Sequence, residues 1–249
     1  MLFDTLDTDD KAQQFRMDRL EKINDEKVWN PMSKGPYCVL HWLPISKGVL
    51  LKPDNLKSMD VSRFIKMERA RKDMRTERIN LDGVRFFWNK GDKIIEKTNA
   101  NKEELKHRYF WNAQIFHSGA LEIACALPFR VDSEKKKWLY PSDVIEELWN
   151  LLDGIKDGFK KHIPSFNTTT RIIVGISFLR ARDYRFPFSP HTPSDRDKIV
   201  LPGMLIENLQ KVQDMEDIER PMFDMLWRSF GLLECDRYDN KGKRETTNA

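Results

Sequence analysis

The architecture of this chain is most visible in residues 109–127, YFWNAQIFHSGALEIACAL. Two apolar runs of strand length, 109–116 and 121–127, flank the short polar segment His117-Ser118-Gly119. A connection of this length that contains a glycine is typical of a β-hairpin. The stretch therefore predicts two antiparallel strands joined by a tight turn.

Strand-like runs occur on both sides of this hairpin. We expect an interior strand over 37–43, ended by Pro44, because the run is apolar and too short for a core helix. Asn80-Leu81-Asp82-Gly83 is a turn signal that precedes a strand over 84–88. The other expected strands are 171–179, 198–201 and 205–206, with 184–188 extending the first of them or pairing with it.

Four segments have the spacing or the capping residues of helices. The first is 9–24, with a narrow apolar line at Phe15, Leu20 and Ile23, and the second is 60–74, with a basic outer surface. The third runs from the Asp143/Glu146 capping box to a point before Pro164. The fourth is 222–230, with Pro221 at its first position and Gly231 after its end. Strand pairs with short turns, and helices between them, predict an α+β fold. We expect a mixed, mainly antiparallel sheet with helices packed on one face.

The expected organisation has three parts. Residues 1–30 form a helical lead-in, and 31–235 form a single α+β domain. Residues 236–249 are polar and charged, and we expect them to be a disordered tail.

Composition limits the possible functions. Lys and Arg number 43 and Asp and Glu 39, so the net charge is +4. Nucleic-acid-binding domains usually have a stronger basic balance or a concentrated basic face, so any contact with nucleic acid must be local. Seven Trp and fifteen Phe make the apolar content too high for a disordered chain.

The cysteines and the termini indicate a compartment. Cys38, Cys125 and Cys235 are widely separated, and none has a cysteine or histidine partner at metal-ligand spacing. Such thiols are typical of a reduced environment. The sequence shows no signal peptide, and no apolar run approaches the roughly 20 residues of a membrane helix. We therefore expect a cytoplasmic protein without a membrane partner.

No catalytic constellation has a recognisable spacing, so no catalytic residue is assigned. A phosphate-binding GxxxxGK[ST] loop is absent, and no nucleotide cofactor is indicated. A divalent-metal nuclease needs converging carboxylates, for which the candidates are Asp82, Glu122, Asp195 and Asp197. We favour turn-forming and ion-pairing roles for these carboxylates. His41 is likewise expected to be a hydrogen-bonded, partly buried residue rather than a general base.

The best candidate for nucleic-acid binding is segment 180–188, RARDYRFPF, which mixes guanidinium groups with aromatic rings. These groups can hold phosphates and stack on bases. The same alternation also fits an ordinary amphipathic edge strand whose aromatic side chains point inward. The candidate residues are Arg180, Arg182, Tyr184 and Arg185, together with Arg71 and Arg75 on the basic side of the expected 60–75 helix.

Two further segments carry a resemblance to a known family. Asp195-Arg196-Asp197-Lys198 is a charged turn that runs into a short apolar strand ended by Pro202, and Pro221 opens the helix that contains Trp227. The other matching positions, scattered over a span from residue 15 to about 231, are Phe15-Arg16, Arg19-Leu20, Ile23, His41, Pro44, Asn80 to Gly83, Gln114, Phe116, Gly119, Glu122 and Gly231. In this order they resemble the C-terminal module of bacterial proteins whose N-terminal half is an Alba-type, Schlafen-like DNA-binding domain. The chain departs from that pattern at Gly203-Met204, where relatives carry an acidic and a β-branched residue.

The resemblance implies a non-catalytic interaction or regulatory module that works with an Alba-type, Schlafen-like nucleic-acid-binding partner, in transcription control or phage defence. The chain begins near the place where the family's N-terminal module ends, so we expect this partner to act in trans. Relatives are often labelled ATP-binding, but these residues do not support that label and no cofactor is implied. Two alternatives stay open: direct DNA or RNA binding through the 180–188 strand, and a divalent-metal nuclease. The oligomeric state is also open.

Overall fold

The computed structural model describes residues 6–25, 35–45, 74–80, 82–88, 93–97, 103–107, 111–125, 129–140, 145, 148–149, 152–158, 170–187, 193–212 and 215–245. Residues 74–80, 84–88, 93–97, 103–107, Trp111 and Gln210 are described by their backbone alone. The helix expected over 60–74 lies outside these residues, except for Met74, which begins a strand.

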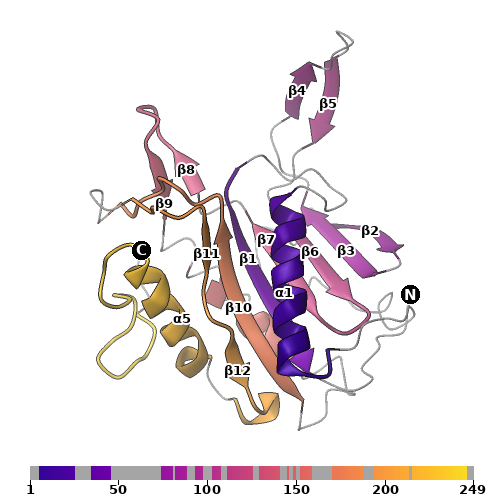
Figure 1. The fold of residues 1–249 in the computed structure, drawn as a ribbon, viewed down its shortest axis with the longest axis vertical. Helices are drawn as coiled ribbons and strands as arrows, with labels where there is room; N and C mark the ends of the chain where they lie inside the picture. Colours follow the sequence, from indigo (N-terminus) through magenta and orange to yellow (C-terminus); the bar gives the residue numbers. More distant parts are fainter. Residues whose placement is uncertain are drawn as a thin grey trace.

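Within the described chain, eight strands form one sheet in which every pair is antiparallel (Figure 1). They are β1 (Tyr37–Ile45), β2 (Met74–Asn80), β3 (Gly83–Trp88), β6 (Trp111–Phe116), β7 (Leu121–Cys125), β10 (Arg171–Leu179), β11 (Lys198–Val200) and β12 (Met204–Ile206). Their order is β11-β10-β1-β7-β6-β3-β2, and β12 also pairs with β10. Two separate hairpins pair β4 (Lys93–Lys97) with β5 (Glu103–His107), and β8 (Phe129–Val131) with β9 (Lys137–Leu139). The predicted α+β class with a mainly antiparallel sheet is confirmed.

The two turns predicted from local sequence are also confirmed. β6 and β7 pair as a hairpin around His117-Ser118-Gly119, and β2 meets β3 at the pair Asn80 and Gly83. Gly83 has a φ of +143°, and a Cβ there would lie 1.9 Å from the carbonyl oxygen of Ile115. Only glycine fits this position, because both the backbone angle and the close approach exclude a side chain.

The first strand does not end before Pro44 as predicted. β1 continues to Ile45, and Pro44 pairs with Ile172 of β10. On its other side β1 pairs with β7 only as far as Trp42. Among the described strands Pro44 therefore has a neighbour on one side only, which is the setting in which a sheet tolerates a residue without an N–H.

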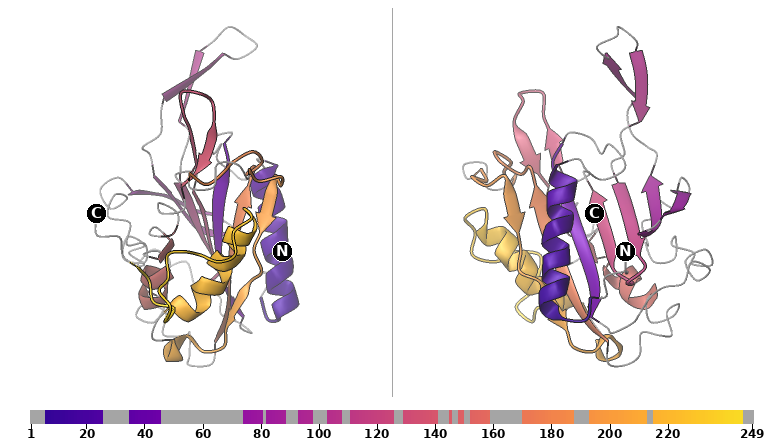
Figure 2. Two further views of the ribbon diagram at one scale, coloured as in Figure 1. Left: turned by 90° about the vertical axis from the view of Figure 1, so that its left-hand side faces the viewer. Right: turned by 45° about the vertical axis from the view of Figure 1, so that its right-hand side comes forward.

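Helices cover both faces of the sheet, whereas the sequence predicted helices on one face only. α1 (Asp9–Asn24) packs on the face of β1 and β10 that carries Val39 and Leu179, whereas α5 (Glu216–Arg228) and helical residues 152–158 pack on the other. The left view of Figure 2 shows α1 and α5 on opposite sides of the strands. Thr8 accepts a hydrogen bond from the N–H of Lys11 and so caps α1.

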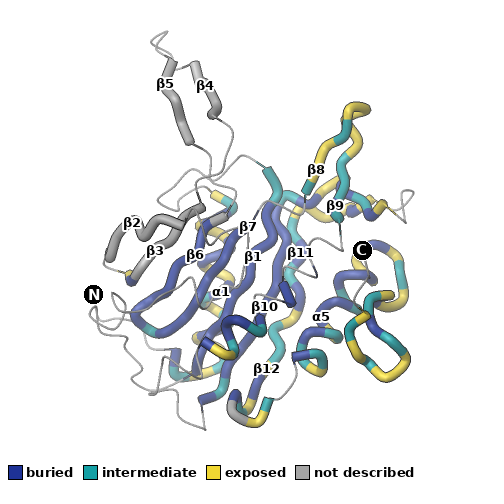
Figure 3. Tube along the Cα trace, turned by 180° about the vertical axis from the view of Figure 1, so that it is seen from behind, coloured by how far each residue is buried: buried dark blue, intermediate teal, exposed yellow. Residues whose placement is uncertain are grey.

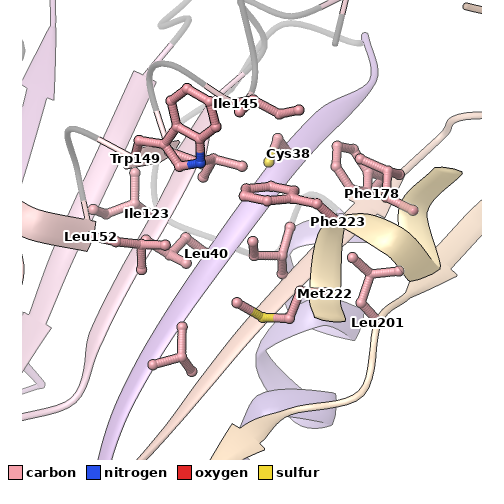
Figure 4. Packing of buried hydrophobic residues seen from close by; sticks show 14 of the residues in the cluster. Cys38, Leu40, Ile123, Ile145, Trp149, Leu152, Phe178, Leu201, Met222 and Phe223 are labelled. Atoms are coloured by element: carbon pink, nitrogen blue, oxygen red, sulfur yellow. The ribbon is translucent and has the colours of Figure 1, made fainter. Parts of the chain in front are cut away.

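The main apolar core lies between the sheet and α5. Phe223 and Met222 of α5 meet Cys38 and Leu40 of β1, and Trp149 closes the same cluster (Figure 4). The central strands are buried along their length, while the β8–β9 hairpin has exposed residues around its tip (Figure 3). Smaller apolar clusters, with Leu20 and Ile23 or with Ala12 and Leu43, lie under α1. A substantial share of the α1 face is instead polar.

The last helix begins earlier than predicted. α5 starts at Glu216, so Pro221 lies inside it and removes the bond to the carbonyl of Asp217. Glu216, Asp217 and Glu219 occupy its first turn, where negative charge is favourable. It ends at Arg228, two residues before the predicted Phe230, with Ser229 as its C-cap. Gly231 follows its end as predicted: its φ is +78°, and the N–H of Leu232 bonds to the carbonyl of Trp227.

Part of the predicted disordered tail is folded against α5. Tyr238 is buried, and its hydroxyl donates to Glu219 at 3.1 Å. Arg244 donates to both carboxylate oxygens of Glu219, at 2.6 and 2.7 Å, and to Asp153 at 2.7 Å. Residues 236–245 are therefore a folded C-terminal segment, not a loose tail.

Candidate nucleic-acid interface

Two facing turns bring together Arg180, Arg182, Tyr184, Arg185, Asp195 and Asp197. We call residues 180–185 and 194–197 the paired turns. Backbone bonds join them: the N–H of Ala181 donates to the carbonyl of Asp197 at 2.9 Å, and the N–H of Ser194 donates to the carbonyl of Tyr184 at 2.7 Å. The segment that links β10 to β11 lies beside β9 at one end of the sheet (Figure 1).

The paired turns are held in an uncommon backbone conformation. Arg180 and Asp183 have φ values of 57° and 68°, in the left-handed region that non-glycine residues rarely adopt. Buried Ser194 stabilises the turn 194–197. Ser194 Oγ accepts a hydrogen bond from the N–H of Arg196 at 3.2 Å and donates one to the carbonyl oxygen of Arg196 at 3.1 Å. Such strain persists only where the surrounding structure enforces it, so the exposed charges here stand on a rigid frame.

The segment 180–186 is not an edge strand, and its aromatic side chains point inward. Tyr184 and Phe186 are buried. The ring of Tyr184 packs edge-on against Phe129 with centroids 5.0 Å apart, and that of Phe186 stacks on Phe230 at 4.1 Å. Burial also raises the pKa of Tyr184. A base cannot stack on these buried rings. The groups of the paired turns that can contact a nucleic acid are therefore the charged ones.

Positive charge is concentrated around the paired turns. The N–H of Leu139 in β9 donates to the carbonyl of Arg185 at 2.9 Å, so the β8–β9 hairpin adjoins them. Residues 130–137 and 180–198 contain nine Lys or Arg and five Asp or Glu, an excess equal to the net charge of +4 of the whole chain. We call this region the basic surface. Arg182, Arg196 and Lys135 are exposed on it.

Local ion pairs neutralise part of this charge. Lys137 lies 3.2 Å from a carboxylate oxygen of Asp183, and Lys136 lies 2.6 Å from one of Glu134. The hydrogen bond and charge of Glu134 raise the pKa of Lys136. Arg196 Nε also lies 3.9 Å from Asp195 Oδ1, and both of these side chains are largely exposed. The surface therefore carries exposed cations of which several have a neighbouring carboxylate.

The remaining metal candidates lie elsewhere, around an arginine of α1. Buried Glu122 accepts from Nε and Nη2 of Arg19 at 2.7 Å each, and Nε2 of His41 lies 3.3 Å from the same carboxylate. Burial alone would raise the pKa of Glu122, but Arg19 outweighs this effect and, with a smaller contribution from His41, lowers the pKa to about 2. Burial lowers the pKa of His41 despite Glu122, so its imidazole is neutral near pH 7.

Asp82 also acts on Arg19. Burial alone would lower the pKa of Arg19, but Glu122 outweighs this effect and raises it, with a smaller contribution from the carboxylate of exposed Asp82. Asp195 and Asp197 are separated from Glu122 by β10 and β1 in the sheet. In the part of the chain that the structure describes, no group of three or more His, Cys, Asp or Glu side chains could hold a metal ion. The guanidinium of Arg19 provides the positive charge beside Glu122.

Sequence reasoning did not assign a role to the two buried arginines of α1. Arg16 Nη2 donates to the carbonyls of Ile176 and Leu201, at 2.9 and 2.8 Å, and to Ser177 Oγ at 2.9 Å. A Cβ on Gly175 would lie 2.4 Å from Arg16 Cζ. The available signal was the i, i+3 spacing of Arg16 and Arg19 on the inward line of the helix, beside Leu20 and Ile23.

Gly203 lies where the edge strand passes close to α1 and β10. Val200 pairs with Ser177 and Met204 with Val174, so the edge strand holds one residue more than β10 between these pairs. A Cβ on Gly203 would lie 2.7 Å from Ile173 Cγ2 of β10 and 2.6 Å from the flexible Gln13 side chain of α1. Glycine here lets the bulged edge strand pass close to α1.

Other candidate positions are less defined. Arg71 lies outside the described residues, and Arg75 belongs to β2, which is described by its backbone alone. A shallow depression of about 400 Å³ is lined by Asp195 and Arg196 of the paired turns and by Met225, Arg228 and Ser229 of the α5 end.

Comparison of the chain with protein-family models, curated proteins and solved structures finds no match. The described helices include none long and apolar enough to span a bilayer. Cys38, Cys125 and Cys235 are buried free thiols.

Proposed function

We propose that this protein is a non-catalytic accessory module for nucleic acid, which contacts the phosphate backbone through the basic surface and works with an Alba-type, Schlafen-like partner. The observation that supports the nucleic-acid contact is the concentration of the chain's positive excess in residues 130–137 and 180–198. Local charge of this kind is what a chain of mild overall charge needs to attract a polyanion.

The exposed chemistry favours phosphates over bases. Arg182, Arg196 and Lys135 present guanidinium and ammonium groups, while Tyr184 and Phe186 are buried. Cationic side chains position a protein on the backbone without reading sequence. The proposed binding is therefore independent of base sequence and strongly dependent on salt, because each phosphate contact releases counterions.

The partner follows from the resemblance alone. We propose that an Alba-type, Schlafen-like protein supplies the main nucleic-acid-binding domain and that this chain regulates it in the cytoplasm, in transcription control or phage defence. Mixing the chain with a separately expressed domain of that type should give a complex by light scattering. Absence of a complex at micromolar concentrations would remove this part of the proposal without affecting direct binding.

The nuclease alternative has less support. A metal-dependent nuclease would use Glu122, yet both carboxylate oxygens of Glu122 accept hydrogen bonds from Arg19. Its lowered pKa reflects that ion pair and does not require a metal. The arrangement favours a structural role for Glu122 and His41.

Direct binding is tested by titrating a fluorescent duplex with the protein at several salt concentrations. Replacing two exposed cations of the paired turns, Arg182→Ala with Arg196→Ala, should weaken binding equally for unrelated sequences and reduce the salt slope by about one unit for each lost contact. The charge-matched control is Lys211→Ala with Lys241→Ala, two exposed lysines outside the basic surface. A flat salt response, or an equal loss in the control, would exclude the proposed interface.

A further inference from the structure

The last turn of α1 is attached to two cations of the basic surface. Lys198 Nζ forms an ion pair with Glu21 Oε1. Arg180 Nη2 donates to the carbonyl oxygen of Asn24, the last residue of the helix, at 2.7 Å. Both cations lie in segment 180–198, which contributes five of the nine Lys and Arg residues of this surface.

This attachment differs from the rest of the helix. Arg16 and Arg19 hold the middle of α1 through bonds that are buried beneath it. At the last turn, by contrast, the Glu21 side chain is 59% exposed and Lys198 is 28% exposed. Exposed ion pairs contribute little to stability, so the Glu21 and Lys198 side chains can separate. Ile23, which is buried beneath the same turn, keeps the helix on the sheet when they do.

The groups that α1 offers to these cations resemble a nucleic-acid backbone in chemistry. A carboxylate and a helix-terminal carbonyl are both negative acceptors, and the C-terminal end of a helix carries partial negative charge. A phosphate would seek the same ammonium and guanidinium groups. Glu21 and the Asn24 carbonyl therefore bind Lys198 and Arg180, two cations that an external polyanion would also bind.

We propose that the last turn of α1 is an autoinhibitory contact that competes with phosphate for Lys198 and Arg180. This inference depends on the proposed function, because it describes the regulation of the same surface. A polyanion on the basic surface displaces Glu21 and the Asn24 carbonyl, and docking of the last turn weakens polyanion binding. A partner that engages the Glu21 carboxylate, and so frees Lys198, would increase the affinity of the protein for nucleic acid.

The test compares two acid-to-amide changes on the same helix. Glu21→Gln removes the carboxylate that pairs with Lys198, whereas Asp10→Asn removes an exposed carboxylate from the first turn, at the other end of the helix. Both raise the net charge by one. Titration of a labelled duplex at fixed salt should show that Glu21→Gln binds roughly two- to fivefold more tightly than Asp10→Asn, the range expected for loss of one exposed competing ion pair. Equal affinities for the two variants would overturn the competition.

Hydrogen exchange gives a second readout. On adding the duplex to the wild-type protein, the amides of Asn24 and Asp25, which lie beyond buried Ile23, should exchange faster, while those around Arg16 stay protected. Unchanged or slower exchange at these two amides in the bound protein would contradict displacement. If neither the wild type nor the variants bind duplex at any salt concentration, the proposed function fails; if the wild type binds but Glu21→Gln matches Asp10→Asn, only the competition fails.

Discussion

Arg19 and Glu122 lie 103 residues apart in the chain and share two hydrogen bonds of 2.7 Å beneath α1. Glu122 sits on β7 directly beside His41 of β1, which in turn pairs with Gly175 of β10. These three positions form a row across the sheet that the two arginines of α1 cover. The helix is thus placed on the sheet by specific polar bonds as much as by apolar packing.

Removing one member of this pair should destabilise the fold strongly. Arg19→Met leaves the carboxylate of Glu122 buried without its main partner, and we expect a loss of about 3–5 kcal/mol in the free energy of unfolding. Urea denaturation measures this loss. Lys11→Met, which removes an exposed ion pair with Asp7, is the control and should cost about 1 kcal/mol or less. Adding Glu122→Gln to Arg19→Met should restore part of the stability, and strictly additive losses would contradict the coupling.

Stability should fall with acid in two stages. The pKa of His41 is lower in the folded protein than its ordinary value of 6.5, so the unfolded state binds a proton more readily. The free energy of unfolding therefore begins to fall as the pH drops below 6.5. The pKa of Glu122 is lowered from 4.5 to about 2, so the stability it provides is complete above 4.5 and is lost between 4.5 and about 2. Urea midpoints measured from pH 8 to pH 3 test both stages. His41→Gln should flatten the profile between pH 7 and pH 5 only, and an unchanged profile in that range would count against a buried neutral imidazole.

The β8–β9 loop should be stabilised by glycine at one position. Asp132 Oδ1 accepts from the N–H groups of Glu134 and Lys136, and Lys135 has a φ of 62°. Asp239 builds the same loop with Lys241 and Lys243 as donors, and there Gly242, with a φ of 79°, occupies the matching position. Lys135→Gly should therefore raise the thermal midpoint, with a gain of about 1 kcal/mol.

The matching loop supplies the control for that prediction. Gly242→Ala should destabilise the protein, because alanine disfavours this backbone angle and its Cβ would lie 2.9 Å from Arg220 Nη1. Thermal midpoints that move in the same direction for both variants would show that the backbone angle does not control these loops.

The folded C-terminal segment should also be essential to stability. Arg244→Met leaves Glu219, which is 0% exposed, without its bidentate partner, and the expected loss is about 3–5 kcal/mol by urea denaturation. Burial already raises the pKa of Glu219 even though Arg244 opposes that shift. Lys243→Met, which removes the more exposed pair with Glu216, is the matched control with an expected cost of about 1 kcal/mol or less. Similar losses in both variants would show that the burial of Glu219 does not determine how much its ion pair contributes to the free energy of unfolding.

Several elements could be predicted from the sequence because they depend on residues a few positions apart. The β6–β7 hairpin follows from its loop length and glycine, the turn at Asn80 to Gly83 follows from its residue types, and the β-branched run 171–179 forms β10. The polar and apolar spacing over 9–24 likewise predicted α1 with its bounds. The residue types pointed to the cations at 180–185 and to the carboxylates at 195–197 separately. They did not predict that the two segments lie together in one surface.

By itself, then, the sequence determined the local elements, because turn chemistry and the spacing of apolar residues act over a few neighbours. Only the tertiary structure decided that Arg16 and Arg19 are buried, that Tyr184 faces inward and that the segment around Arg244 is folded. A charged side chain enters the interior only where a partner such as Glu122, distant in the chain, compensates for its lost hydration. That compensation depends on which strands become neighbours, which no local pattern contains.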